Sequence, residues 1–152
     1  MSDGMTHPDL AGFPIVIPVD VAWGDMDSYG HVNNVIYFRY FEHARIEYLD
    51  RVGWLASMRE TGLGPIVAST SARFRRALIY SDHLLVGAQL ASRQPDRITL
   101  EHRIISLRQD AVVCDGQVVV VSYDYRGSAK APIPEAISAA IDRLENEKAR
   151  GT

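Results

Sequence analysis

The sequence predicts an α+β fold in which an antiparallel sheet of about five strands wraps around one long helix. Three observations support this class. An early apolar stretch alternates with the period of a β-strand, the next stretch repeats at three- and four-residue steps as a helix does, and most of the remainder consists of strand-like runs between short turn signals. One strand, one long helix and four closely connected strands favour an antiparallel sheet packed on the helix.

The first strand and the long helix are defined by their periods. Between residues 15 and 23 every second residue is apolar, which places five side chains on one face of a strand: Ile15, Ile17, Val19, Val21 and Trp23. From Val35 to about Val52 the apolar residues fall on one side of a helix: Tyr37, Tyr40, Phe41, Ala44, Tyr48 and Val52. Gly53, Gly62, Gly64 and Pro65 then indicate a connection.

The rest of the chain is expected to be mostly sheet. We expect strands over residues 66–80, 84–92, 97–107 and 112–125, the first of them long or bent. The sequence Gln94-Pro95-Asp96 is typical of a turn between two of these strands. Pro132 and Pro134 precede a short amphipathic helix, whose apolar residues share a face: Ile137, Ile141 and Leu144.

Length and composition indicate one globular domain. With 152 residues, of which 47% are hydrophobic, we expect a flexible tail over residues 1–13 and a single domain over residues 14–152. The N-terminus lacks the features of a signal peptide, and no apolar stretch approaches the roughly 20 residues that span a bilayer. A net charge of -3 gives no general attraction to nucleic acid or anionic membranes. The single cysteine, Cys114, excludes an internal disulfide and fits a reducing compartment, so we expect a cytoplasmic protein.

The densest polar segment lies between the first strand and the long helix. Residues 25–34 contain two aspartates, a histidine and two asparagines. The first turn of a helix has N–H groups without intrahelical partners, and they attract an oxygen that becomes negative during a reaction. If Asp27 lies beside a carbonyl held by the amides near Asn34, the loop combines a base or nucleophile with an oxyanion hole, as acyl-transfer hydrolysis requires.

These motifs resemble a known family. Trp23-Gly24-Asp25-Met26-Asp27 and Gly30-His31-Val32-Asn33-Asn34, followed by Tyr37, Glu42, Ala44 and Arg45, are similar to the hotdog-fold acyl-CoA thioesterases of the 4-hydroxybenzoyl-CoA thioesterase-like branch, and the resemblance runs from about residue 15 to 134. It implies hydrolysis of acyl-CoA thioesters to a free carboxylic acid and coenzyme A, which is part of the substrate, with no separate cofactor. It also implies a homodimer or homotetramer with the site at the subunit interface.

The resemblance and the local chemistry together give the candidate site residues. We expect Asp27 to act as general base or nucleophile, His31 as an acid or as a group that orients the substrate, and the backbone amide of Asn34 as an oxyanion donor. The candidate substrate-binding residues are Asp25, Gly30, Asn33, Tyr37, Glu42, Arg73 and Arg75. On an extended segment Asp25 would share a side with Asp27. Strand alternation would place Arg73 and Arg75 on one side, where they can bind the phosphates of coenzyme A, and Arg76 on the other.

Each candidate also has a simpler structural interpretation. Asp27 can cap a turn, Asp25 can hold the loop through hydrogen bonds, and His31 can pin the loop. The same structural roles extend to the other candidates: helix capping for Asn33 and Asn34, a turn for Gly30, a place in the core for Tyr37, and a solvated strand face for Arg73 and Arg75. Glu42 offers a rival carboxylate, because another hotdog branch uses a helix glutamate, but it lies three residues from Arg45 and can pair with it.

Two other functions remain open from the sequence. Hotdog enoyl-CoA hydratases also place an Asp and a His before the helix, but they typically carry Asp-x-Asn-Pro before the histidine, whereas this chain has Asp27-Ser28-Tyr29-Gly30-His31. A non-catalytic protein that binds acyl-CoA is the other alternative. We predict no metal, because His43 and Glu47 have ligand spacing without an evident third ligand.

Overall fold

The computed structural model describes the backbone of residues 6–151 and the side chains up to residue 147. Its sheet has the strand order β1-β3-β4-β5-β2, and every neighbouring pair is antiparallel. The short strand β6 pairs with β5 beside this path. The strands are β1 (Ile15–Asp20), β2 (Leu63–Phe74), β3 (His83–Gln94), β4 (Arg97–Ser106), β5 (Ala111–Asp124) and β6 (Ala129–Lys130). The predicted α+β class and sheet size are confirmed.

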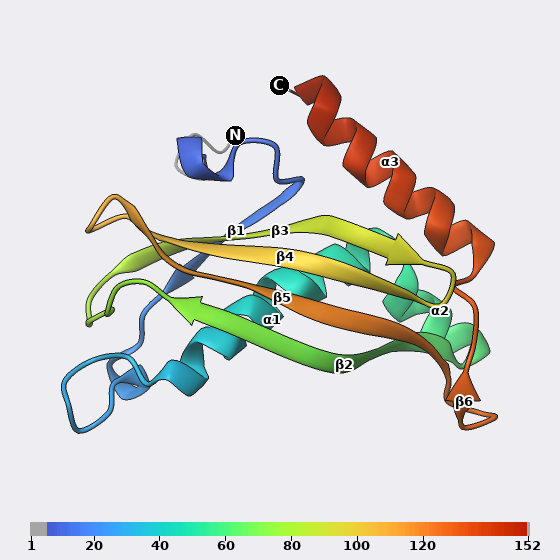
Figure 1. Ribbon diagram of the computed structural model, residues 1–152, viewed down its shortest axis with the longest axis horizontal. Helices are drawn as coiled ribbons and strands as arrows, with labels where there is room; N and C mark the ends of the chain where they lie inside the picture. Colours follow the sequence, from blue (N-terminus) through green and yellow to red (C-terminus); the bar gives the residue numbers. More distant parts are fainter. Residues whose placement is uncertain (1–5, 152) are drawn as a thin grey trace.

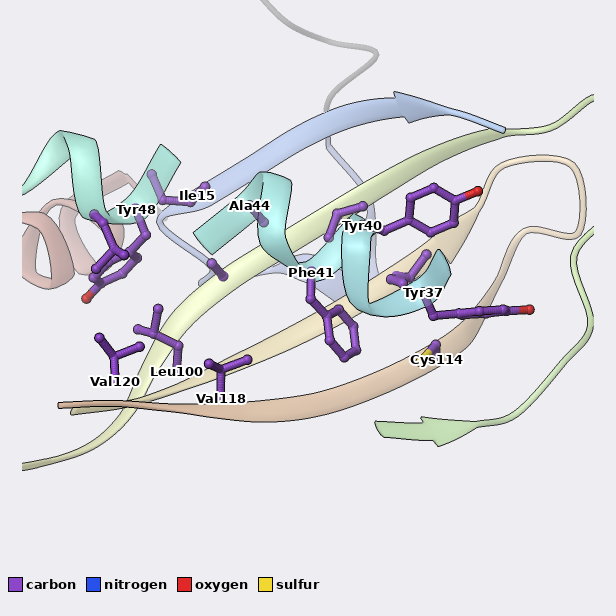
Figure 2. Close-up of a cluster of buried hydrophobic side chains, with 14 of the residues drawn as sticks. Ile15, Tyr37, Tyr40, Phe41, Ala44, Tyr48, Leu100, Cys114, Val118 and Val120 are labelled. Carbon is purple, nitrogen blue, oxygen red and sulfur yellow. The ribbon is translucent and has the colours of Figure 1, made fainter. Parts of the chain in front are cut away.

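The long helix α1 (Asn34–Arg51) packs across the curled sheet (Figure 1). Figure 2 shows Phe41 pointing from α1 toward the sheet residues Val118 and Cys114, and Phe41 is fully buried. Burying such a side chain contributes about 1.5–3 kcal/mol relative to leaving it exposed. The predicted apolar stripe of the helix is the buried one, and it consists of Tyr37, Tyr40, Phe41, Ala44, Tyr48 and Val52.

A second helix, α2 (Trp54–Thr61), occupies part of the segment that the glycines indicated as a connection. Gly53 and Gly62 flank it with φ values of +81° and +82°, a backbone region that glycine enters without steric cost. Gly53 therefore lets the chain turn sharply after α1, and Gly62 ends α2. Trp54 is fully buried, which fixes the helix against the core.

Two expected strands are shorter than their apolar patterns. β1 ends at Asp20, and Trp23 begins a 3-10 helix, η3 (Trp23–Asp25), where its side chain is 73% exposed rather than on the buried face. β2 ends at Phe74 rather than continuing to residue 80. The cause is visible in the ladder, because the N–H groups of Arg75 and Arg76 both donate to the carbonyl of Val113, at 2.8 and 3.2 Å.

The segment before β1 packs against the sheet in its described part. Residues 1–5 of the expected flexible tail lie outside the described residues. Pro8–Leu10 form a 3-10 helix, η2, and the side chains of Leu10 and Phe13 are buried in a small cluster with Leu85 and Ile105. Residues 8–13 therefore belong to the packed part of the domain rather than to a free tail.

The last helix, α3 (Glu135–Gly151), is longer than expected; in Figure 1 it begins near the end of β3 and runs back above that strand. Its predicted apolar face is buried through Ile137, Ile141 and Leu144. β1 pairs only with residues 83–88 of β3. The backbone N–H groups on the rest of that edge of β3 therefore need a hydrogen-bond acceptor other than β1. Glu145 supplies it, since its Oε2 accepts the N–H of Leu90 at 3.0 Å and the hydroxyl of Tyr48 at 2.7 Å. No helix among the described residues combines the length and apolarity needed to cross a membrane.

Candidate active site

The polar segment before α1 folds into a short hairpin. The N–H of Asp27 donates to the carbonyl of His31 at 2.9 Å, and the N–H of Gly30 donates back to the carbonyl of Asp27 at 3.0 Å. Met26 and Val32 form an antiparallel bridge below this pair. Gly30 has a φ of +81°, so the turn requires the conformational freedom that the sequence suggested for this position.

The hairpin leads directly into the capped start of α1. The side-chain oxygen of Asn33 accepts the N–H of Val35 at 3.0 Å, which is the capping role considered for it. Asn34 is the first residue of the helix, so its N–H has no intrahelical acceptor. The backbone at this position therefore offers a donor and the positive end of the helix dipole to a neighbouring oxygen.

A cleft of about 380 Å³ opens beside the start of α1 and the end of β2. Phe74 supplies an apolar wall, is 45% exposed, and packs edge-on against Tyr37 with ring centroids 5.1 Å apart. Tyr37 itself is buried, and its hydroxyl donates to the carbonyl of Arg76 at 3.3 Å. The cleft combines apolar side chains with a helix start and two arginines, and its lining consists of Val32, Asn34, Tyr37, Phe74, Arg75, Arg76 and Ala77.

Asp27 lies in the hairpin that leads into this helix start, and its side chain is half-buried. One carboxylate oxygen, Oδ1, accepts the N–H of Tyr29 at 2.9 Å and so supports the turn. Asp27 is not one of the cleft-lining residues. The structure thus joins the carboxylate and the helix start in one hairpin, while the catalytic role of Asp27 stays a prediction. The His31 side chain is exposed at the same hairpin, where its carbonyl rather than its ring holds the turn.

Asp25 does not share the environment of Asp27. Because Asp25 closes the 3-10 helix η3, the two carboxylates are not on one extended segment, so the alternation that would place them on one side does not apply. Its Oδ2 accepts the N–H of Ala22 at 2.9 Å and the hydroxyl of Tyr40 at 2.8 Å. Burial and the neighbouring Asp25 raise the pKa of Tyr40. These contacts favour the structural interpretation of Asp25.

The arginines are distributed differently from the expected alternation. Arg75 and Arg76 both line the cleft, because β2 ends before them and strand alternation no longer applies. Arg73 lies away from that lining, in a separate depression of about 450 Å³ that also contains Asp115. Arg75 is held by an ion pair between its Nε and the Asp115 carboxylate. Arg76 and Phe74 are cleft residues that sequence reasoning missed, since their positions depend on where the ladder between β2 and β5 stops.

Glu42 lies on the exposed side of α1, where its Oε2 is 3.6 Å from Nη2 of Arg45. This is the pairing that the three-residue spacing suggested. Both residues line a groove of about 330 Å³ between α1 and β2 rather than the cleft at the helix start. A further groove of about 250 Å³ continues along the same seam, with Ile46, Leu49, Pro65 and Val67 in its wall. The seam between α1 and the edge strand β2 is therefore open and largely apolar.

Comparisons with known proteins agree with this architecture. A thioesterase from Thermus thermophilus, solved with coenzyme A and zinc, is 32% identical with a TM-score of 0.77 over 89% of this chain and 97% of that chain. The long-chain acyl-CoA thioesterase of Escherichia coli is 27% identical over 101 residues, which are 66% of this chain and 76% of that protein. A chloroplastic acyl-acyl carrier protein thioesterase of Arabidopsis thaliana is 25% identical over 101 residues, which are 66% of this chain and only 53% of that protein.

A family model covers most of the chain. The model of the Thioesterase-like superfamily matches residues 21–141, which include the hairpin, α1, the strands β2 to β5 and the beginning of α3 up to Ile141. The resemblance to hotdog thioesterases is thus confirmed at the level of fold and family. This chain belongs to the Thioesterase-like superfamily.

Proposed function

We propose that this protein hydrolyses acyl-CoA thioesters to a free carboxylic acid and coenzyme A. The observation that carries the proposal is the cleft at the start of α1, where the unpaired N–H of Asn34 meets an apolar wall and two arginines beside the hairpin of Asp27. The similarity to thioesterases, one solved with coenzyme A and one named for long-chain acyl-CoA, supports the same substrate class.

The proposed chemistry uses few groups. The thioester carbonyl oxygen lies at the Asn34 N–H, which stabilises the negative charge of the tetrahedral intermediate. Asp27 either removes a proton from the attacking water or attacks the carbonyl itself and forms an acyl-aspartyl anhydride. The carbon–sulfur bond breaks when the thiolate of coenzyme A leaves and takes a proton. This step gives the free acid directly where water attacked, and the anhydride where Asp27 attacked. A water molecule then opens the anhydride, which releases the acid and restores the Asp27 carboxylate. His31, exposed at the hairpin, orients the substrate or supplies that proton.

The substrate's two ends meet different parts of the cleft in this proposal. Arg75 and Arg76 contact the phosphates of coenzyme A, because guanidinium groups bind phosphate oxygens in pairs. Arg73 is left out, since it does not line the cleft. Tyr37 and Phe74 form an apolar wall for the acyl group next to the thioester.

We also propose that the protein is at least a homodimer. β2 is the edge strand of the main sheet path, and hydrophobic side chains along it and the facing side of α1 are exposed, among them Ile46, Ile66 and Val67. An exposed edge strand of twelve residues favours pairing with another chain. A second copy across the seam would cover these side chains and bring its own groups toward the cleft. Sedimentation of the purified protein at several concentrations tests this.

The experiment that tests the activity measures thiol release from a panel of short, long and aromatic acyl-CoAs. We expect hydrolysis by the wild type and a loss of about 10²-fold or more in kcat for Asp27→Ala. Asp50→Ala is the matched control, since Asp50 is an exposed aspartate on α1 outside the cleft. The proposal is wrong if the wild type releases no more thiol than Asp27→Ala on any substrate. Single turnover in ¹⁸O-water then tests the two roles of Asp27, because direct attack of water labels only the product acid, whereas an acyl-aspartyl anhydride that water opens at the aspartyl carbonyl leaves the label in the enzyme.

One comparison supports acyl carrier protein, in place of coenzyme A, as the carrier of the acyl group. The similarity to a plant thioesterase named for acyl-acyl carrier protein makes that carrier the alternative to coenzyme A. The same thiol assay with matched acyl chains on the two carriers decides between them through the ratio of their kcat/KM values.

A further inference from the structure

We propose that Tyr40 is a positioning residue for the proposed thioesterase site, and that it acts through Asp25 to hold the hairpin of Asp27 against the first turn of α1. The inference rests on the proposed function for its effect on catalysis. Its structural basis is the hydrogen bond of 2.8 Å between the Tyr40 hydroxyl and Oδ2 of Asp25.

The Tyr40 side chain connects the core to the hairpin. It stands in the second turn of α1, is only 2% exposed, and packs among the core residues of the helix (Figure 2). Its hydroxyl, in contrast, contacts a residue that lies fifteen positions earlier in the chain. The ring cannot move without disturbing the packing of α1, so the hydroxyl is a fixed point for Asp25.

The hydrogen bonds around Asp25 join the base of the hairpin to both the first and the second turn of α1. Its carboxylate is held by Tyr40, while its carbonyl accepts the N–H of Asn33 at 3.0 Å. Asn33 caps the helix that carries Tyr40, through its bond to the N–H of Val35. The pair of Asp25 and Asn33 is the base of the hairpin, and Asp27 lies between them in sequence. Tyr40 thus fixes the base of the hairpin relative to the helix start from which the oxyanion donor projects.

The geometry favours positioning over direct chemistry for this pair. Neither Tyr40 nor Asp25 lines the cleft at the helix start. The donors from Tyr40 and Ala22 reach the same oxygen of Asp25, and burial keeps the Tyr40 hydroxyl protonated by raising its pKa. The requirement at position 25 is therefore an oxygen that accepts two hydrogen bonds. A displacement of about 1 Å in a catalytic group can reduce the rate by about 10²-fold, so losing this anchor should affect turnover.

Four single variants test the proposal. Tyr40→Phe removes the donor and keeps the ring. Asp25→Ala removes the acceptor, whereas Asp25→Asn keeps an oxygen that can accept both bonds. Tyr48→Phe is the matched control, because Tyr48 is also a buried tyrosine of α1 whose hydroxyl donates to a carboxylate, that of Glu145, at 2.7 Å.

We expect specific kinetic differences among these variants. Tyr40→Phe and Asp25→Ala should lower kcat by about 10- to 100-fold with a change in KM of less than about threefold, and the double variant should be no worse than the poorer single variant. Asp25→Asn should stay within about threefold of the wild type and keep its pH profile, while Tyr48→Phe should leave kcat unchanged. The proposal is overturned if Tyr40→Phe behaves like Tyr48→Phe, or if Asp25→Asn is as impaired as Asp25→Ala.

Amide hydrogen exchange gives a readout that does not need turnover. Tyr40→Phe should speed exchange at the N–H groups of Asp27, Gly30 and Asn33, which bond within the hairpin or at its base, and Tyr48→Phe should not. Unchanged exchange in Tyr40→Phe overturns the anchoring role whatever the activity. A wild type without thioesterase activity refutes the proposed function instead, and the exchange data then decide the anchoring role separately.

Discussion

His102 should make the folding stability of this protein depend on pH below neutrality. The residue lies on β4, is fully buried, and stacks on Phe41 with ring centroids 5.1 Å apart. Its Nδ1 lies 3.1 Å from the carbonyl of Gly87, so the neutral ring carries its proton on Nδ1. Burial lowers the pKa of His102 from 6.5 to about 4. In the folded protein the ring therefore stays neutral at pH values where the unfolded chain binds a proton.

The sign and size of the effect follow from this difference. Between the unfolded and the folded pKa the unfolded state binds more protons, so the free energy of unfolding decreases as the pH falls. The loss from His102 begins below pH 6.5, amounts to about 2 kcal/mol at pH 5, and reaches about 3 kcal/mol below pH 4. This is a large part of the roughly 5–15 kcal/mol that stabilises a typical domain.

The assay is denaturant unfolding at pH 8 and pH 5 at one fixed protein concentration. His102→Asn removes the titration and keeps a donor for the carbonyl of Gly87, so its stability should change by about 2 kcal/mol less between the two pH values than that of the wild type. His83→Asn is the control. His83 is exposed and Asp20 raises its pKa, so its contribution has the opposite sign. An equal decrease in the wild type and His102→Asn would refute the argument.

Three further pairs of substitutions test the packing and capping on which the site depends. Gly116→Ala should prevent stable folding, measured by thermal unfolding, because a Cβ there would lie 2.1 Å from the backbone oxygen of Ser71, whereas Gly24→Ala meets nothing within 4 Å and should be tolerated. Asn33→Ala should cost about 1 kcal/mol in denaturant unfolding through loss of the helix cap, and Asn33→Ser should restore most of it. Glu145→Ala should cost about 1–3 kcal/mol by leaving two partly buried donors, the hydroxyl of Tyr48 and the N–H of Leu90, without this acceptor, and Glu145→Gln less, since its amide oxygen still accepts.

Periodicity predicted the core because the core is made from regular faces. The apolar stripe of α1 and the alternating residues of β4 are buried as their spacing indicates. Trp23 departs from its pattern, because the Asp25 carboxylate accepts the N–H of Ala22 and closes a 3-10 turn after β1. Helix α2 was missed because its two flanking glycines resemble a loop in sequence, whereas their positive φ values bound a helix.

The part of the site that could be predicted from the sequence is the part whose hydrogen bonds join residues close together in the chain. The bonds from Asp27 to His31, from Gly30 to Asp27 and the Asn33 cap join residues within ten positions, so the motif of residues 25–34 contains the information for them. The bond from the Val32 N–H to the carbonyl of Leu78 and the bond from Tyr40 to Asp25 lie outside that motif. The cleft wall depends instead on where β2 stops pairing with β5. That stop is set by Val113, whose carbonyl accepts from both Arg75 and Arg76, and no pattern within residues 66–80 encodes it. The place of Arg76 in the cleft wall is therefore evident only from the structure.

The two aspartates of the motif show why residue type and spacing are insufficient to assign roles. Asp25 and Asp27 have the same chemistry and lie two positions apart, yet Asp25 bonds to Ala22 and Tyr40, and Asp27 bonds within its own turn to Tyr29. The difference arises because a 3-10 helix ends at Asp25 and the hairpin begins after it. A carboxylate held by a buried tyrosine is suited to fixing the backbone, and one at the hairpin turn is free to meet substrate with its second oxygen. Asp25→Asn and Asp27→Asn should therefore differ sharply in turnover although they make the same chemical change.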